Sequence, residues 1–324
     1  MEFIIIILFV IVQIIFIPLA MLGSLLIFYS KIQIRKKLSV SATAINVING
    51  QWIMDIFGIR KDTAAVNLNE VLQSTSVIGL WLMHFPLYML YRITGKNIIF
   101  PAIASEGKEA PRNLAVSRTL YIDKILNRLK SNAEQFVVIN AGIGTRCYSM
   151  FHNSGLQLFE LDLPEIQKEK LKMLADANVD TNAVTYIPIN LHIDDWFSIL
   201  IDSGFDLNKK TIFLWEGASK YLWEGDIRNI IGEIKANASE GSSIICDFYS
   251  QQYLSGEYRN WTKPAKKELD ITEDTLGFGL DFSLDYENTL KLFVESEGAK
   301  IGETYFLGNK TIRGTFMAVV EIIV

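Results

Sequence analysis

Hydrophobic and polar positions divide the chain into two parts with different patterns. Residues 3–29 are almost continuously apolar, with Gln13 and Ser24 as the strongly polar exceptions. From about residue 113 onward, short apolar runs alternate with longer stretches of helical periodicity. Such alternation is typical of an α/β domain in which strands and helices follow one another. The pattern therefore predicts an apolar N-terminal helix followed by an α/β domain.

The N-terminal apolar stretch is long enough to cross a membrane. At a rise of about 1.5 Å per residue it exceeds the hydrocarbon core of about 30 Å. It begins Met-Glu and is longer than the apolar part of a cleaved signal peptide. Basic residues follow at once, at Lys31 and at positions 35–37, and such charge favours the cytoplasmic side. We therefore predict a single-pass membrane anchor over residues 1–38 with the rest of the chain cytoplasmic; the alternative is a buried core helix.

Residues 39–112 form a predicted helical extension and connector. Helical periodicity is weak over residues 39–60. Residues 77–91 are apolar but short for a membrane span, and they contain Pro86, so we predict an interfacial or buried helix kinked at the proline. Residues 95–112 are rich in glycine, proline and charge, which marks a boundary. The second domain is therefore predicted over residues 113–324.

The stretch of residues 135–170 contains the strongest chemical signal. An apolar run over residues 136–141 leads into Gly142-Ile143-Gly144, and a second run over residues 156–161 ends on Asp162. This order predicts a strand, a glycine turn, a helix, a second strand and an acid. In an open parallel sheet, ligands bind beyond the carboxyl ends of the strands, where an acid can accept hydrogen bonds from ribose hydroxyls. The stretch therefore indicates a nucleoside-containing cofactor.

The residues around the turn narrow the choice of nucleoside. A dinucleotide fingerprint would place a third glycine where this chain has Cys147, and no glycine-lysine-serine/threonine sequence follows for a phosphate-binding loop. S-adenosylmethionine contains a ribose and no phosphate, so it needs a glycine turn and an acid but no pyrophosphate site. The spacing thus favours S-adenosylmethionine over a nicotinamide cofactor, and a purely structural turn remains the third possibility.

Further apolar runs complete the predicted sheet. Strands are expected over residues 183–189, 211–215 and 242–248, and the second of these ends on Glu216, a charge that needs a partner at the end of a buried strand. Runs over residues 301–307 and 315–324 are so close together that they can pair only as antiparallel neighbours. The predicted fold is therefore a mostly parallel α/β sheet with a C-terminal antiparallel hairpin.

Composition excludes several classes of function. The net charge is -5, and no basic run is long enough to follow a nucleic-acid backbone. The two cysteines are far apart and there are only three histidines, so we predict neither a disulfide framework nor a metal site. The acidic pair Asp194 and Asp195 is more typical of a helix N-cap than of a catalytic site.

Five blocks of sequence, in this order, carry a resemblance to a known family. They are Ser117-Arg118-Thr119 with Asp123, VVINAGIGTR, FELDLPEIQKEK, IPINL and EGASKYL. Together they resemble the leucine carboxyl methyltransferase family, a branch of the class I S-adenosylmethionine-dependent methyltransferases that also includes bacterial small-molecule O-methyltransferases. The resemblance covers roughly residues 115–248 and implies a class I methyltransferase fold with a Rossmann-like sheet.

The resemblance implies a set of cofactor-binding positions: Arg118, Asn140, Gly142, Gly144, Asp162, Asn190, Leu191 and Glu216. Arg118 is expected to pair with the methionine carboxylate of S-adenosylmethionine, and Gly142 to lie against its backbone. Asp162 is expected to bind the ribose, and Asn190 with Leu191 the adenine. Glu216 is expected at the rim shared by cofactor and substrate. Tyr221 supports that rim, so Glu216 and Tyr221 are the candidate catalytic residues at the substrate side.

Three positions depart from the family pattern. Asn140 stands where the family has the first glycine of its turn, Gly144 where it has an aspartate, and Asn190 where it has an aspartate beside the adenine. The amide of Asn190 can still donate or accept a hydrogen bond. Asn140 puts a side chain where the backbone is expected to approach the cofactor, which argues for weaker binding.

The implied function is an S-adenosylmethionine-dependent O-methyltransferase that methylates a carboxylate or hydroxyl of a small or amphipathic molecule. The membrane anchor favours a lipid-like methyl acceptor. One alternative is a non-catalytic, membrane-anchored binding protein on a degenerate methyltransferase fold, motivated by Asn140 and Gly144. The other is a nicotinamide-dependent oxidoreductase, which the missing third glycine and the C-terminal hairpin both disfavour.

Overall fold

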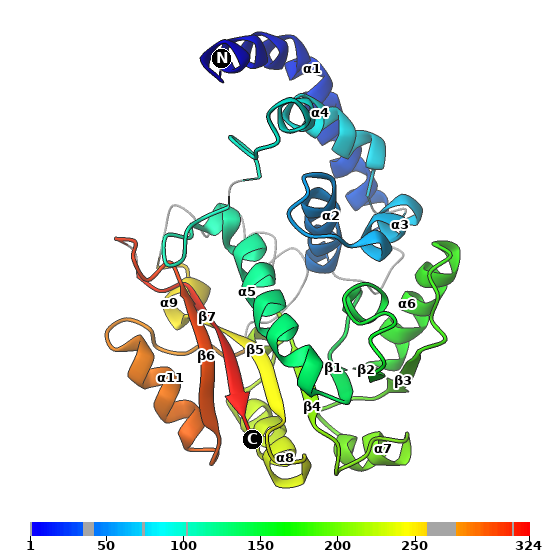
Figure 1. Ribbon diagram of the computed structural model, residues 1–324, viewed down its shortest axis with the longest axis vertical. Coiled ribbons are helices and arrows are strands. Elements are labelled where there is room, and N and C mark those ends of the chain that lie inside the picture. The colour runs from blue at the N-terminus through cyan, green and yellow to red at the C-terminus, as the bar shows by residue number, and fades with distance from the viewer. Residues whose placement is uncertain (1, 35–41, 73–74, 102, 258–276, 313) are drawn as a thin grey trace. The chain divides into compact units, whose positions relative to one another are not determined.

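The computed structural model describes residues 2–34, 42–72, 75–101, 103–257, 277–312 and 314–324 (Figure 1). The chain divides into two compact units. The first contains Met1–Ala102, Ile143–Met150 and Glu169–Asp180, and the second contains Ile103–Gly142, Phe151–Lys168 and Thr181–Val324. The basic residues at 35–37, on which the predicted orientation in the membrane depends, lie outside the described residues.

The first unit is helical. Its helices are α1 (Glu2–Ile34), α2 (Ala42–Ile56), α3 (Thr63–Val71) and α4 (Val77–Thr94). Within α1, Phe9–Ser30 is long and apolar enough to cross a membrane, by length and composition alone. The helix predicted over residues 77–91 is present and continues to Thr94, with Pro86 inside it. Its start is capped by Ser76, whose hydroxyl oxygen accepts a hydrogen bond from the Gly79 N–H at 3.0 Å.

The second unit contains a seven-stranded sheet with the order β3-β2-β1-β4-β5-β7-β6. The strands are β1 (Gln135–Ile139), β2 (Gln157–Asp162), β3 (Val184–Pro188), β4 (Thr211–Trp215), β5 (Ser243–Tyr249), β6 (Lys300–Leu307) and β7 (Met317–Ile323). Strands β1 to β5 pair in parallel, whereas β7 is antiparallel to both β5 and β6. The predicted fold class, a mostly parallel sheet with a C-terminal antiparallel hairpin, is confirmed.

Helices cover both faces of this sheet. The remaining helices are α5 (Leu114–Leu129), α6 (Pro164–Asp176), α7 (Trp196–Asp202), α8 (Glu224–Asn237), α9 (Gln251–Leu254) and α11 (Tyr286–Glu295), and α6 from Glu169 onward groups with the first unit. Buried side chains of α7, α8 and α11 share one core with every second strand residue, such as Val137 and Cys246. Helix α5 contacts β5, β6 and β7 (Figure 1). Because side chains alternate along a strand, Asp247 faces away from the core that contains Cys246.

The prediction of a helix between β1 and β2 is wrong. The connection contains instead a single three-residue 3-10 turn, η3 (Arg146–Tyr148). The residues that follow explain the difference, because Ser149, Asn153 and Gly155 favour turns over helix. Asn153 and Gly155 both adopt positive φ, at 58° and 80°, which ends any helical path before β2 begins.

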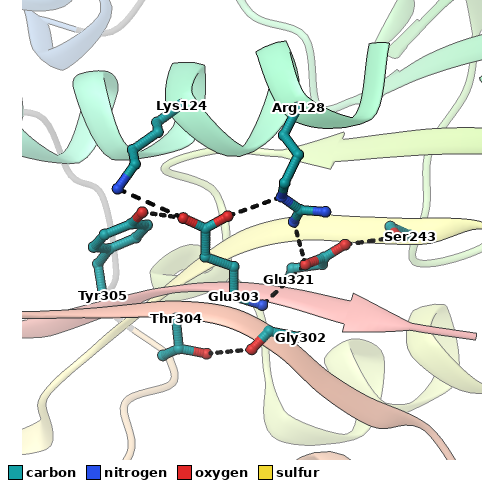
Figure 2. A network of polar contacts seen from close by, with 8 residues as sticks. All are labelled: Lys124, Arg128, Ser243, Gly302, Glu303, Thr304, Tyr305 and Glu321. Carbon is teal, nitrogen blue, oxygen red and sulfur yellow. Dashed lines mark hydrogen bonds and ion pairs between the residues drawn. The ribbon is translucent and has the colours of Figure 1, made fainter. Parts of the chain in front are cut away.

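A network of charged side chains fastens α5 to the hairpin strands (Figure 2). Arg128 on α5 donates to Glu303 on β6 at 2.9 Å and to Glu321 on β7 at 2.5 Å. Glu321 is almost fully buried and also accepts a hydrogen bond from the Glu303 backbone N–H at 2.9 Å. Tyr305 donates to the remaining oxygen of Glu303, and Lys124 lies 3.7 Å from it. The network therefore fixes the helix that carries Arg118 against β6 and β7.

This network predicts a pH-dependent contribution to stability. Hydrogen bonding from Tyr305, together with Arg128, lowers the pKa of Glu303 below its ordinary value of 4.5. A carboxyl whose pKa is lower in the folded state stabilises the fold above its unfolded-state pKa, and that stabilisation is lost as the pH falls through the folded-state pKa. Glu303→Gln is therefore expected to destabilise the protein more at pH ~7 than at pH ~3. Urea unfolding of the full-length chain in detergent at both pH values measures this difference; an equal effect at both would exclude the ionised network.

Candidate functional site

The parallel strands bring a row of polar residues to one level at their carboxyl ends. Asn140 follows β1, Asp162 ends β2, Glu216 follows β4, and Asp247 lies near the end of β5. The strand registers bring these four residues to the same level. The order of strands reverses between β1 and β4, because the chain moves outward to β2 and β3 and then returns to the other side of β1. Such a reversal is where open α/β sheets bind ligands. The candidate site therefore lies at this edge.

Asp162 holds the start of the glycine turn. One carboxylate oxygen accepts a hydrogen bond from the Gly142 N–H at 2.5 Å, and the other accepts one from the Leu163 N–H at 2.7 Å. The side chain is only half-buried. This pair of contacts fixes the orientation of the carboxylate beside the turn. The structure thus brings Asp162 and Gly142 together, as the sequence predicts.

Asn140 adopts the backbone conformation that a glycine turn requires. Its φ is 52°, in the left-handed region, and Gly142 two residues later has φ of 50°. Asparagine is among the non-glycine residues that tolerate this region best, which explains how it can replace a glycine there. A Cβ atom added at Gly142 would meet no described heavy atom within 4 Å, so the space beside that residue is open. Gly144 lies in the segment Ile143–Met150, which groups with the first unit.

Arg118 is the centre of a buried charge cluster. Its guanidinium lies 3.2 Å from the Glu216 carboxylate and 3.5 Å from that of Asp247, and it donates to the Tyr249 hydroxyl at 3.2 Å. Burial by itself would lower the pKa of Arg118, but Tyr249, Glu216 and Asp247 raise it by more, so the guanidinium stays charged. Glu216 therefore has the partner that its position at a strand end requires.

Sequence analysis missed Asp247 and Tyr249 as members of this cluster. Asp247 is fully buried, and burial raises the pKa of its carboxyl although Arg118 and the Gly217 N–H oppose this. That N–H donates to Asp247 at 2.6 Å. The signal was available, because Asp247 is an acid inside an otherwise apolar run, SSIICDF, and such a buried charge needs a cation from elsewhere in the fold.

The turn after Glu216 shapes the other side of the cluster. Gly217 has φ of 71°, and a Cβ atom there would lie 3.2 Å from Nη1 of Arg118, so glycine allows the arginine to approach. Ser219, two residues later, donates to the Asp247 backbone oxygen at 2.5 Å. The Lys220 ammonium lies 4.9 Å from the ring centre of Tyr221 and 4.8 Å from that of Tyr249. Tyr221 therefore lies next to the cluster through Lys220.

The predicted adenine residues lie in a tight turn after β3. The Asn190 side-chain oxygen accepts a hydrogen bond from the His192 N–H at 3.0 Å, and the Asn190 N–H donates to Asp194 at 2.7 Å. Leu191 is half-buried against the core of the second unit. Asp195 is the N-cap of α7 and accepts from Ser198, as the sequence predicts. Asn190 thus uses one amide atom to shape its own turn, and the turn joins the site through β3, which pairs with β2.

Within the described ranges, no group of three or more histidine, cysteine, aspartate or glutamate side chains has an arrangement that could hold a metal ion. The chemistry of the site is carried by carboxylates, one arginine and backbone amides.

Comparison with known proteins finds similarity in the part of the chain that contains most of the candidate site. Residues 95–235 match the model of the family described as leucine carboxyl methyltransferase, which confirms the resemblance predicted from the sequence. YktD of Bacillus subtilis, provisionally named an S-adenosyl-L-methionine-dependent methyltransferase, is 33% identical over 146 residues, 44% of this chain and 47% of that protein. A Mycolicibacterium smegmatis protein with the same name is 28% identical over 189 residues, 55% of this chain and 59% of that protein.

The chain therefore spans about half the length of the curated relatives it matches. Among solved structures, the magnesium protoporphyrin IX methyltransferase of Synechocystis with bound SAH aligns with a TM-score of 0.43 at 10% identity, over 68% of this chain and 89% of that protein.

Proposed function

We propose that this protein is an S-adenosylmethionine-dependent O-methyltransferase. The observation that carries the proposal is the row of Asp162, Asn140 and Glu216 at the reversal point of the sheet, inside the segment that matches the family model. The relatives are named as dependent on S-adenosyl-L-methionine, which supports this cofactor and disfavours the nicotinamide alternative. The left-handed backbone at Asn140 supports the proposal further, because it preserves the shape of the turn.

The residues at this edge fit the proposed cofactor in three respects. The space beside Gly142 is open, and no phosphate-binding loop is needed. Asp162 is half-exposed and already oriented by backbone amides, so it would accept hydrogen bonds from ribose hydroxyls. The Nε of Arg118 is buried and has no hydrogen-bond partner among the residues that the structure describes, which leaves a donor for a carboxylate. A methionine moiety provides that carboxylate.

The proposed mechanism depends on positioning. When bound, S-adenosylmethionine supplies a methyl group on a positively charged sulfur. Asp162 and Arg118 would fix the two ends of the cofactor, and Glu216, half-buried beside Arg118, would face the substrate side together with Tyr221. Alignment of reacting groups and exclusion of water can together supply about 7–11 kcal/mol. The protein then needs no covalent intermediate.

We propose a carboxylate as the methyl acceptor, with a hydroxyl as the second possibility. A carboxylate is already ionised at neutral pH and needs no general base, whereas an alcohol does. Burial raises the pKa of Tyr249, so its hydroxyl stays protonated near neutral pH, and the Asp247 carboxylate is already held by Arg118 and the Gly217 N–H. The family description, leucine carboxyl methyltransferase, agrees with this choice.

We also propose that α1 attaches the protein to a membrane, with the α/β domain on the cytoplasmic side. Its length and apolar character support this attachment. Enzymes held at a membrane meet molecules that concentrate there, so the acceptor is proposed to be amphipathic or lipid-like.

The test uses the full-length chain in detergent with S-adenosylmethionine labelled on the methyl group. It is offered fatty acids, short polar acids and long-chain alcohols in parallel. We expect transfer to fatty acids as methyl esters, which release labelled methanol in base. Base-stable methyl ethers would identify a hydroxyl acceptor instead. Cofactor binding without transfer to any acceptor would favour the non-catalytic alternative.

A further inference from the structure

Helix α1 packs mainly on one helix, α4. Its partly or fully buried positions recur at helical spacing: Phe9, Gln13, Phe16, Ala20, Gly23, Leu26, Ile27 and Ser30. This spacing places them on one stripe, and α4 is the helix with which α1 makes most of its contacts. The other sides of α1 are exposed; Ile15 is 69% exposed, Met21 64% and Leu25 63%. One stripe therefore faces protein and the remainder of the helix faces outward.

The two helices run antiparallel and in close contact. A Cβ atom added to Gly23 would lie 2.5 Å from the Gly79 backbone oxygen, so the backbones approach at these glycines. Phe16, two stripe positions earlier on α1, stacks on Phe85 of α4 with ring centres 5.7 Å apart. Moving toward the N-terminus of α1 thus corresponds to moving toward the C-terminus of α4.

The opposite side of α4 packs on α2 through aromatic rings. Trp81 meets Trp52 edge to face at 5.2 Å, and the Phe57 ring lies 6.2 Å from Tyr88 and 5.9 Å from Tyr91. Helix α4 therefore forms a middle layer between α1 and α2.

Both ends of α4 are tied to this same α2 layer. Just before α4, the Thr75 hydroxyl donates to the Asn49 side chain of α2 at 2.7 Å. Just after it, the Asn97 side chain donates to the Phe57 backbone oxygen at 3.1 Å. Asn49 also accepts from Asn69 of α3 at 2.9 Å, so the layer beneath α4 contains buried polar contacts. Both ends of α4 therefore lie against the same polar layer, on the same side of the membrane. It follows that α4 does not cross the bilayer.

These contacts also constrain α1. We infer that α1 lies in the plane of one membrane leaflet, and that it does not cross the bilayer as the single-pass anchor expected from its length. The inference rests on the proposed membrane attachment and is independent of methyl transfer. A crossing helix would have to leave α4, whereas α1 contacts α4 through Phe16, Gly23 and Ile27.

The sequence of layers matches the polarity of a leaflet. Helix α1 has a diameter of about 10 Å, and half of the hydrocarbon core is about 15 Å thick, so one leaflet can contain α1 and the exposed flank of α4. That flank presents Ile78, Phe85, Met89 and Ile93. Beneath it lie Trp81, Tyr88 and Tyr91, the residue types that favour the membrane interface. The polar contacts of Asn49 come last, on the water side.

The inference predicts that the N-terminus, the α2–α3 region and the C-terminus all lie on one side of the membrane. The test uses the full-length chain in sealed vesicles, with a protease-cleavable tag at each terminus and with Lys61→Cys as a third reporter. Lys61 is 83% exposed, whereas the native Cys147 and Cys246 are buried. A membrane-impermeant maleimide reports on position 61.

Each outcome separates the possible geometries. We expect both terminal tags and position 61 to react, and we expect the protein to stay on the vesicles after carbonate washing. A protected N-terminal tag with the other two sites accessible means a single crossing and overturns the inference. Position 61 on the side opposite both tags means that α1 and α4 both cross, which also overturns it. Release by carbonate refutes the membrane attachment itself.

A cross-linking pair tests the packing on which the inference depends. Phe16→Cys with Phe85→Cys is expected to cross-link in vesicles with a short bis-maleimide. The control pair, Ile15→Cys with Phe85→Cys, starts from a residue on the exposed side of α1 and is expected to cross-link at least about tenfold less. Equal yields, or none from either pair, would show that α1 leaves α4 in the membrane.

Discussion

Replacing Arg118 with methionine is expected to lower the free energy of unfolding by about 3–5 kcal/mol, because it leaves one fully buried and one half-buried carboxylate without their cation. Asp247 is fully buried and Glu216 half-buried, and both lie within 3.5 Å of the guanidinium. Urea unfolding of the full-length chain in detergent measures the loss.

Two further variants separate the charge cluster from a general effect of losing an arginine. Arg112→Met removes an exposed arginine just before α5 and is expected to change stability by less than about 0.5 kcal/mol. Asp247→Asn added to Arg118→Met is expected to recover part of the loss, because the uncompensated charge is removed. The losses in the free energy of unfolding caused by Arg118→Met and by Asp247→Asn are also added. If the double variant loses more than this sum, the cluster does not act as a buried ion pair.

Asp162→Ala is expected to weaken binding of S-adenosylmethionine by about 10- to 100-fold, since hydrogen bonds to a charged acceptor contribute about 1.5–3 kcal/mol. The variant also removes the acceptor for the Gly142 N–H, which holds the start of the turn. Calorimetric titration of the full-length chain measures the affinity.

Asp202→Ala provides the matched control. Asp202 is an exposed acid at the end of α7, and its removal is expected to leave the affinity unchanged. Unfolding curves of both variants establish that each is folded at the temperature of the titration. An affinity for Asp162→Ala equal to that of the parent would mean that this acid does not bind the ribose.

Most of the sheet could be predicted from the sequence because buried parallel strands form short, continuous apolar runs. The apolar runs located all seven strands to within about two residues, as with the run over 211–215 that forms β4. The connection after β1 could not be predicted in this way. Its glycine turn looked like the start of a helix, but Asn153 and Gly155 take up left-handed backbone before one can form.

The charge cluster shows where pattern analysis ends. Arg118 and Glu216 were predicted to lie at the site, but the pairing of Arg118 with Asp247 joins residues 129 positions apart and depends on α5 crossing β5. The network of Arg128, Glu303 and Glu321 holds that helix in place (Figure 2). Local sequence does not specify such packing.

Helix α1 illustrates the same limit on a larger scale. Its length and composition predict a membrane helix, but they do not tell whether it crosses the bilayer. The burial pattern of α1 becomes informative only together with the packing of α1 on α4 and of α4 on α2.

The central claim is that the edge of the sheet at Asp162 and Arg118 binds S-adenosylmethionine. Titration of the folded full-length chain with S-adenosylmethionine, and in parallel with NAD, tests it most directly. We predict saturable binding of one S-adenosylmethionine per chain and no heat from NAD. No heat from S-adenosylmethionine at about 1 mM, a concentration that detects even weak sites, would contradict the account.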